Sequence, residues 1–309
     1  MANDYHHLSV LLDATIECLQ PRAGGTYLDG TVGGGGHAEA ILQASTPDGR
    51  VVGLDRDPAA LQAATSRLSK YGDRFSPVRS DFASMVEVAG RWAPFDGILL
   101  DLGVSSPQLD HAERGFSFRN DGPVDMRMDP KQELTAASLL ERIDENGLVD
   151  ILRRYGEEPR ARRIAKAILE GRPWSSTVAL ANCVSESSGY RNSRTHPATR
   201  TFQALRMAVN DELGQLSRAL DAAMSMLAKR GRLAIISFHS LEDRMVKRHF
   251  RQAAGENSPK DPYGNPINAP AFTLPHRRGI AGKDADPNNP RSRSARLRII
   301  EKILPPVPH

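Results

Sequence analysis

A glycine-rich turn between an apolar segment and an alanine-rich segment constrains the fold of this 309-residue chain more than any other feature. The stretch reads Tyr27-Leu-Asp-Gly-Thr-Val-Gly-Gly-Gly-Gly-His37, and Ala38 to Ala44 follows it. Glycines let the backbone turn sharply and approach a ligand closely, and the first N–H groups of the next helix point at that ligand. The stretch therefore predicts a strand, a cofactor-binding turn and a helix, as in a Rossmann-like α/β fold. A glycine-rich surface loop is the alternative.

The charges around the turn indicate which cofactor it holds. There is no Lys or Arg from residue 26 to residue 49, whereas Asp29 ends the predicted strand. A dinucleotide or a nucleoside triphosphate carries phosphates, and this segment has no cationic side chain to bind them. This argues against an NAD-dependent dehydrogenase and against an ATPase. S-adenosylmethionine has no phosphate, and its ammonium and sulfonium groups are cations that a carboxylate attracts. We therefore expect Asp29, Gly33, Gly34, Gly35 and Gly36 to bind S-adenosylmethionine.

Three further predicted strands bring side chains to the same edge of the sheet. The strand from Arg50 ends at Asp55, 26 positions after Asp29, where an acid can hold the ribose hydroxyls; capping the helix from Pro58 is the alternative role. The strand 75–78 precedes Phe82, which either stacks on adenine or belongs to the core. The strand from Phe95 delivers Asp101 to the carboxyl edge, where open α/β sheets bind ligands.

The spacing of the strands predicts two domains. About 110 residues separate Asp101 from the next convincing strand, 232–238, and this is too long for one crossover. We expect a discontinuous methyltransferase domain over 1–109 and 216–309 and an inserted helical RNA-recognition domain over 110–215. Helical periodicity predicts helices over 139–154, 161–169 and 198–227. The last apolar segment, 296–303, is expected to be an antiparallel strand at the far end of the sheet.

The predicted helix 198–227 has two distinct faces. Its apolar residues recur every three or four positions as one buried stripe, and its polar residues gather on another face that meets either the substrate or solvent. The stripe consists of Phe202, Leu205, Val209, Leu213, Leu216 and Leu220, and the polar face of His196, Arg200, Gln203 and Asn210.

Composition narrows the class of partner. The net charge is only +4, but 13 basic against five acidic residues occur from Arg244 onward, and further basic clusters lie at 153–166 and 191–206. Such clusters suit a polyanion such as RNA, although each alone can be an ordinary solvated surface. The two cysteines have no metal-ligand spacing, and no apolar run is long enough to cross a membrane. We expect a cytoplasmic protein with no metal; its oligomeric state is left open.

Several motifs together resemble the bacterial 16S ribosomal RNA cytosine-N4 methyltransferases, the RsmH or MraW family. The resemblance covers nearly the whole chain. The stretches that carry it are Leu28-Asp-Gly-Thr-Val-Gly-Gly-Gly-Gly-His37, Gly53-Leu-Asp-Arg-Asp-Pro58, Asp101-Leu-Gly-Val-Ser-Ser-Pro-Gln-Leu109, Arg114-Gly-Phe-Ser-Phe118, Asp125-Met-Arg-Met-Asp129, His196-Pro-Ala-Thr-Arg-Thr-Phe-Gln203 and Ser237-Phe-His-Ser-Leu-Glu-Asp-Arg244.

The resemblance implies a cofactor, a substrate and a set of contacts. It implies that the inserted domain helps to recognise RNA in the small ribosomal subunit, and that the product is N4-methylcytidine in the decoding region of 16S rRNA. His37 either touches the methionine part of the cofactor or caps the helix. The implied S-adenosylmethionine contacts are Gly35, Gly36, His37, Asp55, Phe82, Asp101 and Gln108.

The residues that hold the target base are expected after the fourth strand. Many amino methyltransferases have there an Asp, Asn or Ser followed by two prolines and an aromatic, whereas this chain has Ser105-Ser106-Pro107-Gln108. We expect Ser105 or Ser106 to orient the amino group. Candidate stacking rings are Phe116, Phe118 and Phe238, candidate proton acceptors are His239 and Asp125, each of which is otherwise structural, and Arg127, His196 and Arg200 complete the expected substrate contacts.

A protein that binds assembling ribosomes without catalysis is the competing class of function. In that case the glycine turn would serve folding, and the RNA contact would be the activity. Transfer of labelled methyl to small subunits separates the two.

Overall fold

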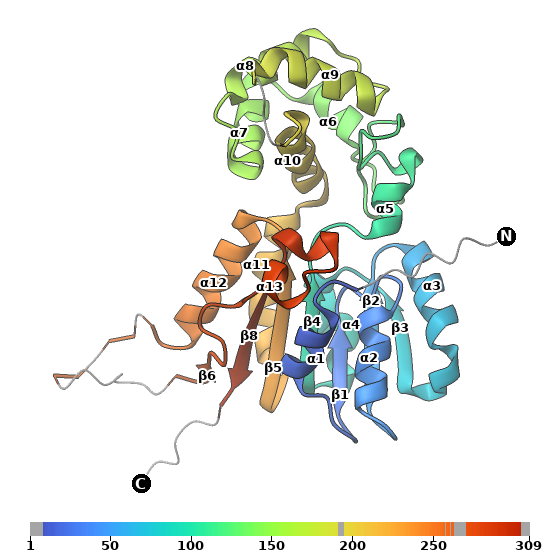
Figure 1. Ribbon diagram of the computed structural model, residues 1–309, viewed down its shortest axis with the longest axis vertical. Coiled ribbons are helices and arrows are strands. Elements are labelled where there is room, and N and C mark those ends of the chain that lie inside the picture. The colour runs from blue at the N-terminus through green and yellow to red at the C-terminus, as the bar shows by residue number, and fades with distance from the viewer. Residues whose placement is uncertain (1–8, 191–194, 257, 260, 263–269, 304–309) are drawn as a thin grey trace. The chain divides into compact units, whose positions relative to one another are not determined.

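The computed structural model describes residues 9–190, 195–256, 258–259, 261–262 and 270–303, without the side chain of Ser106. The chain divides into two compact units (Figure 1). The first consists of Met1–Gly103 and Gln215–His309, and the second of Val104–Gly214. Each unit is described by itself below.

The first unit is built on a mixed sheet with the strand order β3-β2-β1-β4-β5-β8-β6, and β7 also pairs with β8. Neighbours from β3 to β5 are parallel, and β8 is antiparallel to β5. The chain therefore has the Rossmann-like α/β fold that the glycine turn predicted, and the last long strand is antiparallel as expected, with the short β6 beyond it. The strands are β1 (Thr26–Asp29), β2 (Arg50–Asp55), β3 (Phe75–Arg79), β4 (Phe95–Asp101), β5 (Leu227–Ser237), β6 (Phe272–Thr273), β7 (Ile280–Ala281) and β8 (Arg296–Lys302).

Helices cover both faces of this sheet (Figure 1). One core cluster joins the strands to α4, α11 and α12, and the other joins them to α1, α2 and α3. The central strands read as nearly continuous apolar runs because both of their faces are buried. The helices are α1 (Leu12–Leu19), α2 (Gly36–Ala44), α3 (Pro58–Leu68), α4 (Met85–Ala89), α11 (Glu212–Ser225), α12 (Ser240–Ala253) and α13 (Gly282–Ala285).

The glycine turn connects β1 to α2 and needs glycine at particular positions. Gly33 and Gly35 have φ angles of 50° and 82°, a region that costs other residues energy. Gly35 is also the N-cap of α2, and a Cβ there would lie 3.2 Å from the Leu68 side chain of α3. The turn is thus held between the sheet and α3.

Gly35→Ala is expected to lower the free energy of unfolding by about 1–3 kcal/mol, because alanine adds both left-handed strain and a crowded contact with α3. Denaturant titration measures the change. Gly90→Ala is the matched control, since Gly90 has no positive φ and open space around its Cβ position. Equal stabilities of the two variants would contradict this account of the turn.

The second unit is helical around its own apolar core. The predicted helix 139–154 is two helices, because Asp144 caps a new one by accepting a hydrogen bond from Gly147 N–H at 2.8 Å. The helix starting at Ala161 was predicted, whereas α9, capped by Ser176, was missed. The helices are α5 (Ser106–Asp110), α6 (Ala136–Arg142), α7 (Glu145–Gly156), α8 (Ala161–Glu170), α9 (Thr177–Ser188) and α10 (Ala198–Asn210).

The predicted single helix 198–227 is wrong at one position. Asp211 adopts a left-handed conformation with φ 47°, so α10 ends at Asn210 and α11 begins at Glu212. The apolar stripe divides there. Its α10 part, including Leu205, lies in the core of the helical unit, and its α11 part, including Leu216, lies in the core under the sheet.

Candidate functional site

Three carboxylates end three adjacent strands of the parallel sheet. Asp29 ends β1, Asp55 ends β2 and Asp101 ends β4, and β1 lies between the other two. Asp29 Oδ1 accepts the Thr31 N–H at 3.1 Å, and the Thr31 hydroxyl accepts the Asp101 N–H at 2.6 Å. The carboxyl edge of the sheet is therefore acidic where the glycine turn begins.

Burial makes these carboxyl groups hard to ionise. Asp29 is 1% exposed, and desolvation raises its pKa to about 7. Desolvation, together with the charges of Asp29 and Glu242, raises the pKa of Asp101 well above its usual range. A quarter of the Asp101 side chain is exposed, but its Oδ1 atom is buried and has no hydrogen-bond partner among the described residues. Such a group favours a cationic ligand, because a nearby positive charge offsets the cost of ionisation.

The Asp55 carboxylate joins the glycine turn to the turn after β2. Its Oδ2 accepts the Gly33 N–H at 3.0 Å and its Oδ1 accepts the Asp57 N–H at 2.9 Å. The alternative role for Asp55 as a helix cap is wrong, because Asp57 caps α3 by accepting the Ala59 N–H. Each Asp55 oxygen keeps a second lone pair for a ribose hydroxyl.

His37 lies in the first turn of α2 and is buried. Burial lowers its pKa to about 4, so the ring is neutral at pH 7. Its Nε2 donates to the Val10 carbonyl at 3.0 Å, which leaves Nδ1 as an acceptor, 3.9 Å from Asp101 Oδ2. His37 does not cap the helix, since Gly35 is at the N-cap. Its ring instead ties the segment before α1 to the acidic edge.

Phe82 follows β3 in a short 3₁₀ helix, 82–84. The preceding Asp81 caps this helix by accepting the Ser84 N–H at 2.9 Å. The Phe82 ring is half-buried against the core under the sheet. It thus has one side in the core and a partly exposed remainder.

The stretch after β4 begins the second unit, where Ser105 is the N-cap of α5. The Gln108 side chain is buried, and its Oε1 accepts the Ser105 N–H at 3.0 Å. Gln108 therefore orders the backbone of the serine pair. The side chain of Ser106 lies outside the part of the chain that the structure describes.

Two of the predicted substrate contacts in the second unit lie together. The Phe118 and His196 ring centroids are 4.6 Å apart, and Phe202 packs against Phe118 from another side at 4.8 Å. His196 is exposed and Phe118 is half-buried. Phe116, in contrast, is 7% exposed within the apolar core of this unit, so its ring is not available to stack on a base and the prediction for it is wrong.

Arg127 and Asp125 form an ion pair with each other. Arg127 Nε and Nη2 bond to the two Asp125 oxygens at 2.8 and 2.7 Å, and Nη1 donates to the Gln132 carbonyl. Burial alone would raise the pKa of Asp125, but the bonds from Arg127 hold it below the usual value. Asp125 is therefore a poor proton acceptor. The N–H groups of Arg127 bond to Asp125 and to the Gln132 carbonyl of this loop, and not to a substrate.

The polar face predicted for α10 contains both an exposed residue and residues that bond to the protein's own backbone. Arg200 is exposed, whereas Gln203 donates to the Tyr155 carbonyl at 3.0 Å. Asn210 is 2% exposed; it accepts the Met128 N–H and donates to the Met126 carbonyl, both at 2.8 Å. Asn210 thus faces neither a substrate nor solvent, because its side chain holds the 126–128 loop. The helical pattern of the sequence does not reveal this role.

Phe238 and His239 follow β5 at the carboxyl edge of the first unit. His239 is the N-cap of α12, with its Nδ1 accepting the Glu242 N–H at 3.4 Å, and Glu242 in turn accepts the Phe238 N–H at 3.0 Å. These bonds support the structural role for His239 that the sequence left open. Phe238 is half-buried.

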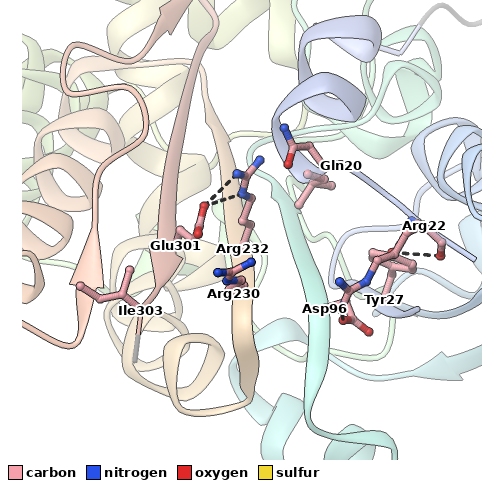
Figure 2. Close-up of a pocket in the computed structure, with 9 residues that line it drawn as sticks. Gln20, Arg22, Tyr27, Asp96, Arg230, Arg232, Glu301 and Ile303 are labelled. Atoms are coloured by element: carbon pink, nitrogen blue, oxygen red, sulfur yellow. Dashed lines mark hydrogen bonds and ion pairs between the residues drawn. The ribbon is translucent and has the colours of Figure 1, made fainter. Parts of the chain in front are cut away.

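A pocket of about 560 Å³ opens at the other edge of the sheet, near the amino ends of β1, β4 and β5. Its charged side chains are largely matched: Arg22 pairs with Asp96 at 2.6 Å and Arg232 with Glu301 at 2.8 Å (Figure 2). None of the predicted cofactor residues lines it. The acidic carboxyl edge, and not this pocket, carries the candidate chemistry.

The Rossmann-like sheet, its glycine turn and its acidic carboxyl edge together define an S-adenosylmethionine-dependent methyltransferase. The chain belongs to the MraW methylase family, whose model matches residues 4–303. No helix in the described ranges combines the length and the apolar character needed to cross a bilayer.

Curated relatives match along nearly their full lengths. A protein of Heliobacterium modesticaldum named Ribosomal RNA small subunit methyltransferase H is 51% identical, over 97% of this chain and 99% of its own. One of Synechococcus elongatus with the same name is 47% identical, over 98% and 97%. Among solved structures, a putative rRNA methylase from Clostridium thermocellum has a TM-score of 0.45 at 12% identity, over 96% and 98% of the two chains, a likeness too distant to add to the assignment.

Proposed function

We propose that this chain transfers the methyl group of S-adenosylmethionine to the N4 amino group of a cytosine in the decoding region of 16S rRNA, within the small ribosomal subunit in the cytoplasm. The observation that carries the proposal is family membership over residues 4–303. The relatives' name supports rRNA of the small subunit as the substrate. The acidic carboxyl edge supports the cationic cofactor.

The residues of the first unit fit the cofactor group by group. S-adenosylmethionine supplies a methyl group already activated on a sulfonium. We assign the cationic portion to Asp29 and Asp101, the ribose hydroxyls to Asp55 and the adenine to the exposed side of Phe82. The backbone of Gly33 to Gly36 and the neutral ring of His37 line the same edge. Gln108, in the second unit, orders the start of α5.

The serines after β4 are proposed to hold the target amino group. The lone pair of a cytosine amino group is delocalised into the ring, so the amino group needs hydrogen-bond acceptors that orient it toward the methyl donor. A serine hydroxyl and nearby carbonyls accept such bonds. Because Gln108 holds the Ser105 N–H, the backbone there is already ordered, and positioning supplies much of the rate acceleration.

The helical unit is proposed to recognise RNA. Along α8 the side chains of Arg162, Arg163 and Lys166 are exposed, whereas Ile164 and Ile168 face the core. An exposed row of cations contacts phosphates, and exposed rings contact bases. His196, whose ring lies tilted against Phe118, and Arg200 on α10 are the ring and the cation that we assign to the RNA.

Nucleoside mass spectrometry of rRNA from cells with and without this protein tests the proposal. Loss of N4-methylcytidine without the gene, and its return when labelled methyl is supplied to purified small subunits with the protein, is expected. Unchanged N4-methylcytidine would overturn the substrate assignment. Binding to small subunits with no transfer of label would instead favour an assembly factor.

Substituting both serines tests their role. Ser105→Ala with Ser106→Ala is expected to lower kcat by roughly 10- to 1,000-fold with unchanged affinity for S-adenosylmethionine, because the hydroxyls are assigned to the amino group and not to the cofactor. Single-turnover methylation and calorimetry measure the two quantities. Ser117→Ala is the matched control in the same unit. Full activity of the double variant would rule the serines out.

A further inference from the structure

The exposed face of α12 is basic. Val246 and Phe250 bury the opposite face in the core under the sheet. Arg244 and Arg248 are exposed and Lys247 is half-buried, so the cations follow one another along the outer side of the helix. Lys247 and Arg248 have no hydrogen-bond or ion-pair partner among the described residues. These two side chains are therefore free to meet an external anion.

A second basic segment is attached to the start of β8. Arg277 and Arg278 are exposed in the turn before β7. Arg296 Nη1 donates to the Arg278 carbonyl at 3.0 Å, and Arg296 Nε lies 3.8 Å from Asp243 Oδ2 of α12. These interactions join the turn to the first half of α12. We call Lys247, Arg248, Arg277 and Arg278 the basic rim.

Asp243, one helical turn before Lys247 on α12, is already paired with arginines of β8. Asp243 receives two hydrogen bonds from Arg298, at 2.6 and 3.0 Å, in addition to the charge of Arg296. Arg298 is only 7% exposed, so this pair is internal. Asp243 therefore pairs with arginines of β8. It does not neutralise the cations of the rim, which face solvent.

The rim borders the edge of the sheet that carries the candidate site. Arg296 pairs with Ser237, the last residue of β5, and Leu297 pairs with Ile280 of β7. The helix α12 begins at Ser240, directly after β5. These positions lie at the carboxyl edge, where Asp29 and Asp101 end their strands, and Lys247 and Arg248 follow about two turns further along α12. A strand of RNA with one base at this edge would carry its flanking phosphates past the rim.

We propose that the basic rim binds the phosphate backbone of the RNA on one side of the target base. The proposal deepens the proposed function and rests on it. Lys and Arg contacts with phosphates give affinity without sequence preference and release counterions. The rim would thus place the RNA against the methyltransferase unit, in addition to contacts made by the helical unit.

Two double variants test the rim: Lys247→Gln with Arg248→Gln, and Arg277→Gln with Arg278→Gln. Each is expected to raise the Kd and the KM for small subunits roughly tenfold near 0.15 M salt, with little change in kcat. Each should also reduce the slope of log K against log salt by about 0.7–0.9 for every phosphate that the variant no longer neutralises. Affinity for S-adenosylmethionine should stay the same.

Lys229→Gln with Arg230→Gln is the matched control. Both residues are exposed on the same unit, in the early part of β5 at the opposite edge of the sheet, and the charge removed is equal. Wild-type RNA affinity and salt slope in both rim variants would overturn the rim, as would equal losses in the control. Failure of the proposed function is distinct, because the wild-type protein itself would then leave cytosine unmethylated.

Discussion

Asp101→Asn is expected to weaken S-adenosylmethionine binding roughly 100-fold, which corresponds to about 2.7 kcal/mol. Asparagine keeps the shape of the side chain but removes the charge that attracts a cation in a partly desolvated position. The buried Oδ1 of Asp101, without a hydrogen-bond partner among the described residues, makes this carboxylate the one most dependent on the ligand. Calorimetry measures the decrease in affinity.

The same substitution should raise the stability of the protein without cofactor. Burial and the charges of Asp29 and Glu242 disfavour ionised Asp101, so a neutral side chain relieves a cost that the wild type carries at neutral pH. Weaker binding together with a higher melting temperature distinguishes this explanation from simple misfolding. A lower melting temperature would contradict it.

Asp96→Asn is the matched control for Asp101→Asn. Asp96 lies near the amino end of the same strand, β4, where it pairs with Arg22 and accepts the Thr26 N–H. Its substitution removes an equal charge at the other edge of the sheet and should leave cofactor affinity within about twofold of the wild type. A similar decrease in both variants would mean that net charge, and not position, controls binding.

Cofactor affinity is expected to rise with pH up to about pH 7, the range in which Asp29 becomes ionised. Burial raises the pKa of Asp29 to about 7 in the free protein, so a cation that binds beside it must displace a proton at lower pH. Below that pKa the association constant should increase by up to about tenfold per pH unit for each proton released. His37 contributes little to this range, since its pKa is about 4.

Calorimetry in buffers with different ionisation enthalpies counts the protons released on binding. Asp29→Asn should flatten the pH profile, whereas Asp48→Asn, an exposed carboxylate before β2, should not. A flat wild-type profile from about pH 5.5 to about pH 8 would show that Asp29 is ionised before the cofactor arrives.

The stability of the free protein should depend on pH with the opposite sign. Because the folded pKa of Asp29 is raised above its usual value of 3.8, the folded state holds the proton more tightly than the unfolded chain. The stabilising effect of protonation is complete below about pH 4 and is lost as the pH rises through about 7. Folding thus favours the protonated form of Asp29, whereas cofactor binding favours its ionised form.

Much of the acidic edge could be predicted from local patterns. Asp29, Asp55 and Asp101 each end an apolar run, and the carboxyl ends of parallel strands meet at one edge of a sheet. The glycine turn could be predicted equally well, because the φ angles of Gly33 and Gly35 are ones that glycine adopts easily. These features depend on residues close together in the chain.

Long-range contacts decided the roles that the sequence misassigned. Phe116 resembles an exposed stacking ring until the core of the helical unit encloses it. Asn210 and Arg127 are polar residues whose partners, Met128 and Gln132, lie in a loop that no periodicity predicts. Polar side chains look alike in sequence whether they bind a ligand or satisfy a buried backbone group.

The amino-acid sequence by itself determined the Rossmann-like class, the family and the acidic strand ends, because strand periodicity, turn chemistry and charge act over a few residues. Only the tertiary structure decided where the long apolar stripe divides at Asp211, and how Arg296 and Asp243 join two distant basic segments into one rim. The reason is physical: a stripe or a charge acquires its role from what packs against it, and its partners here come from distant parts of the chain.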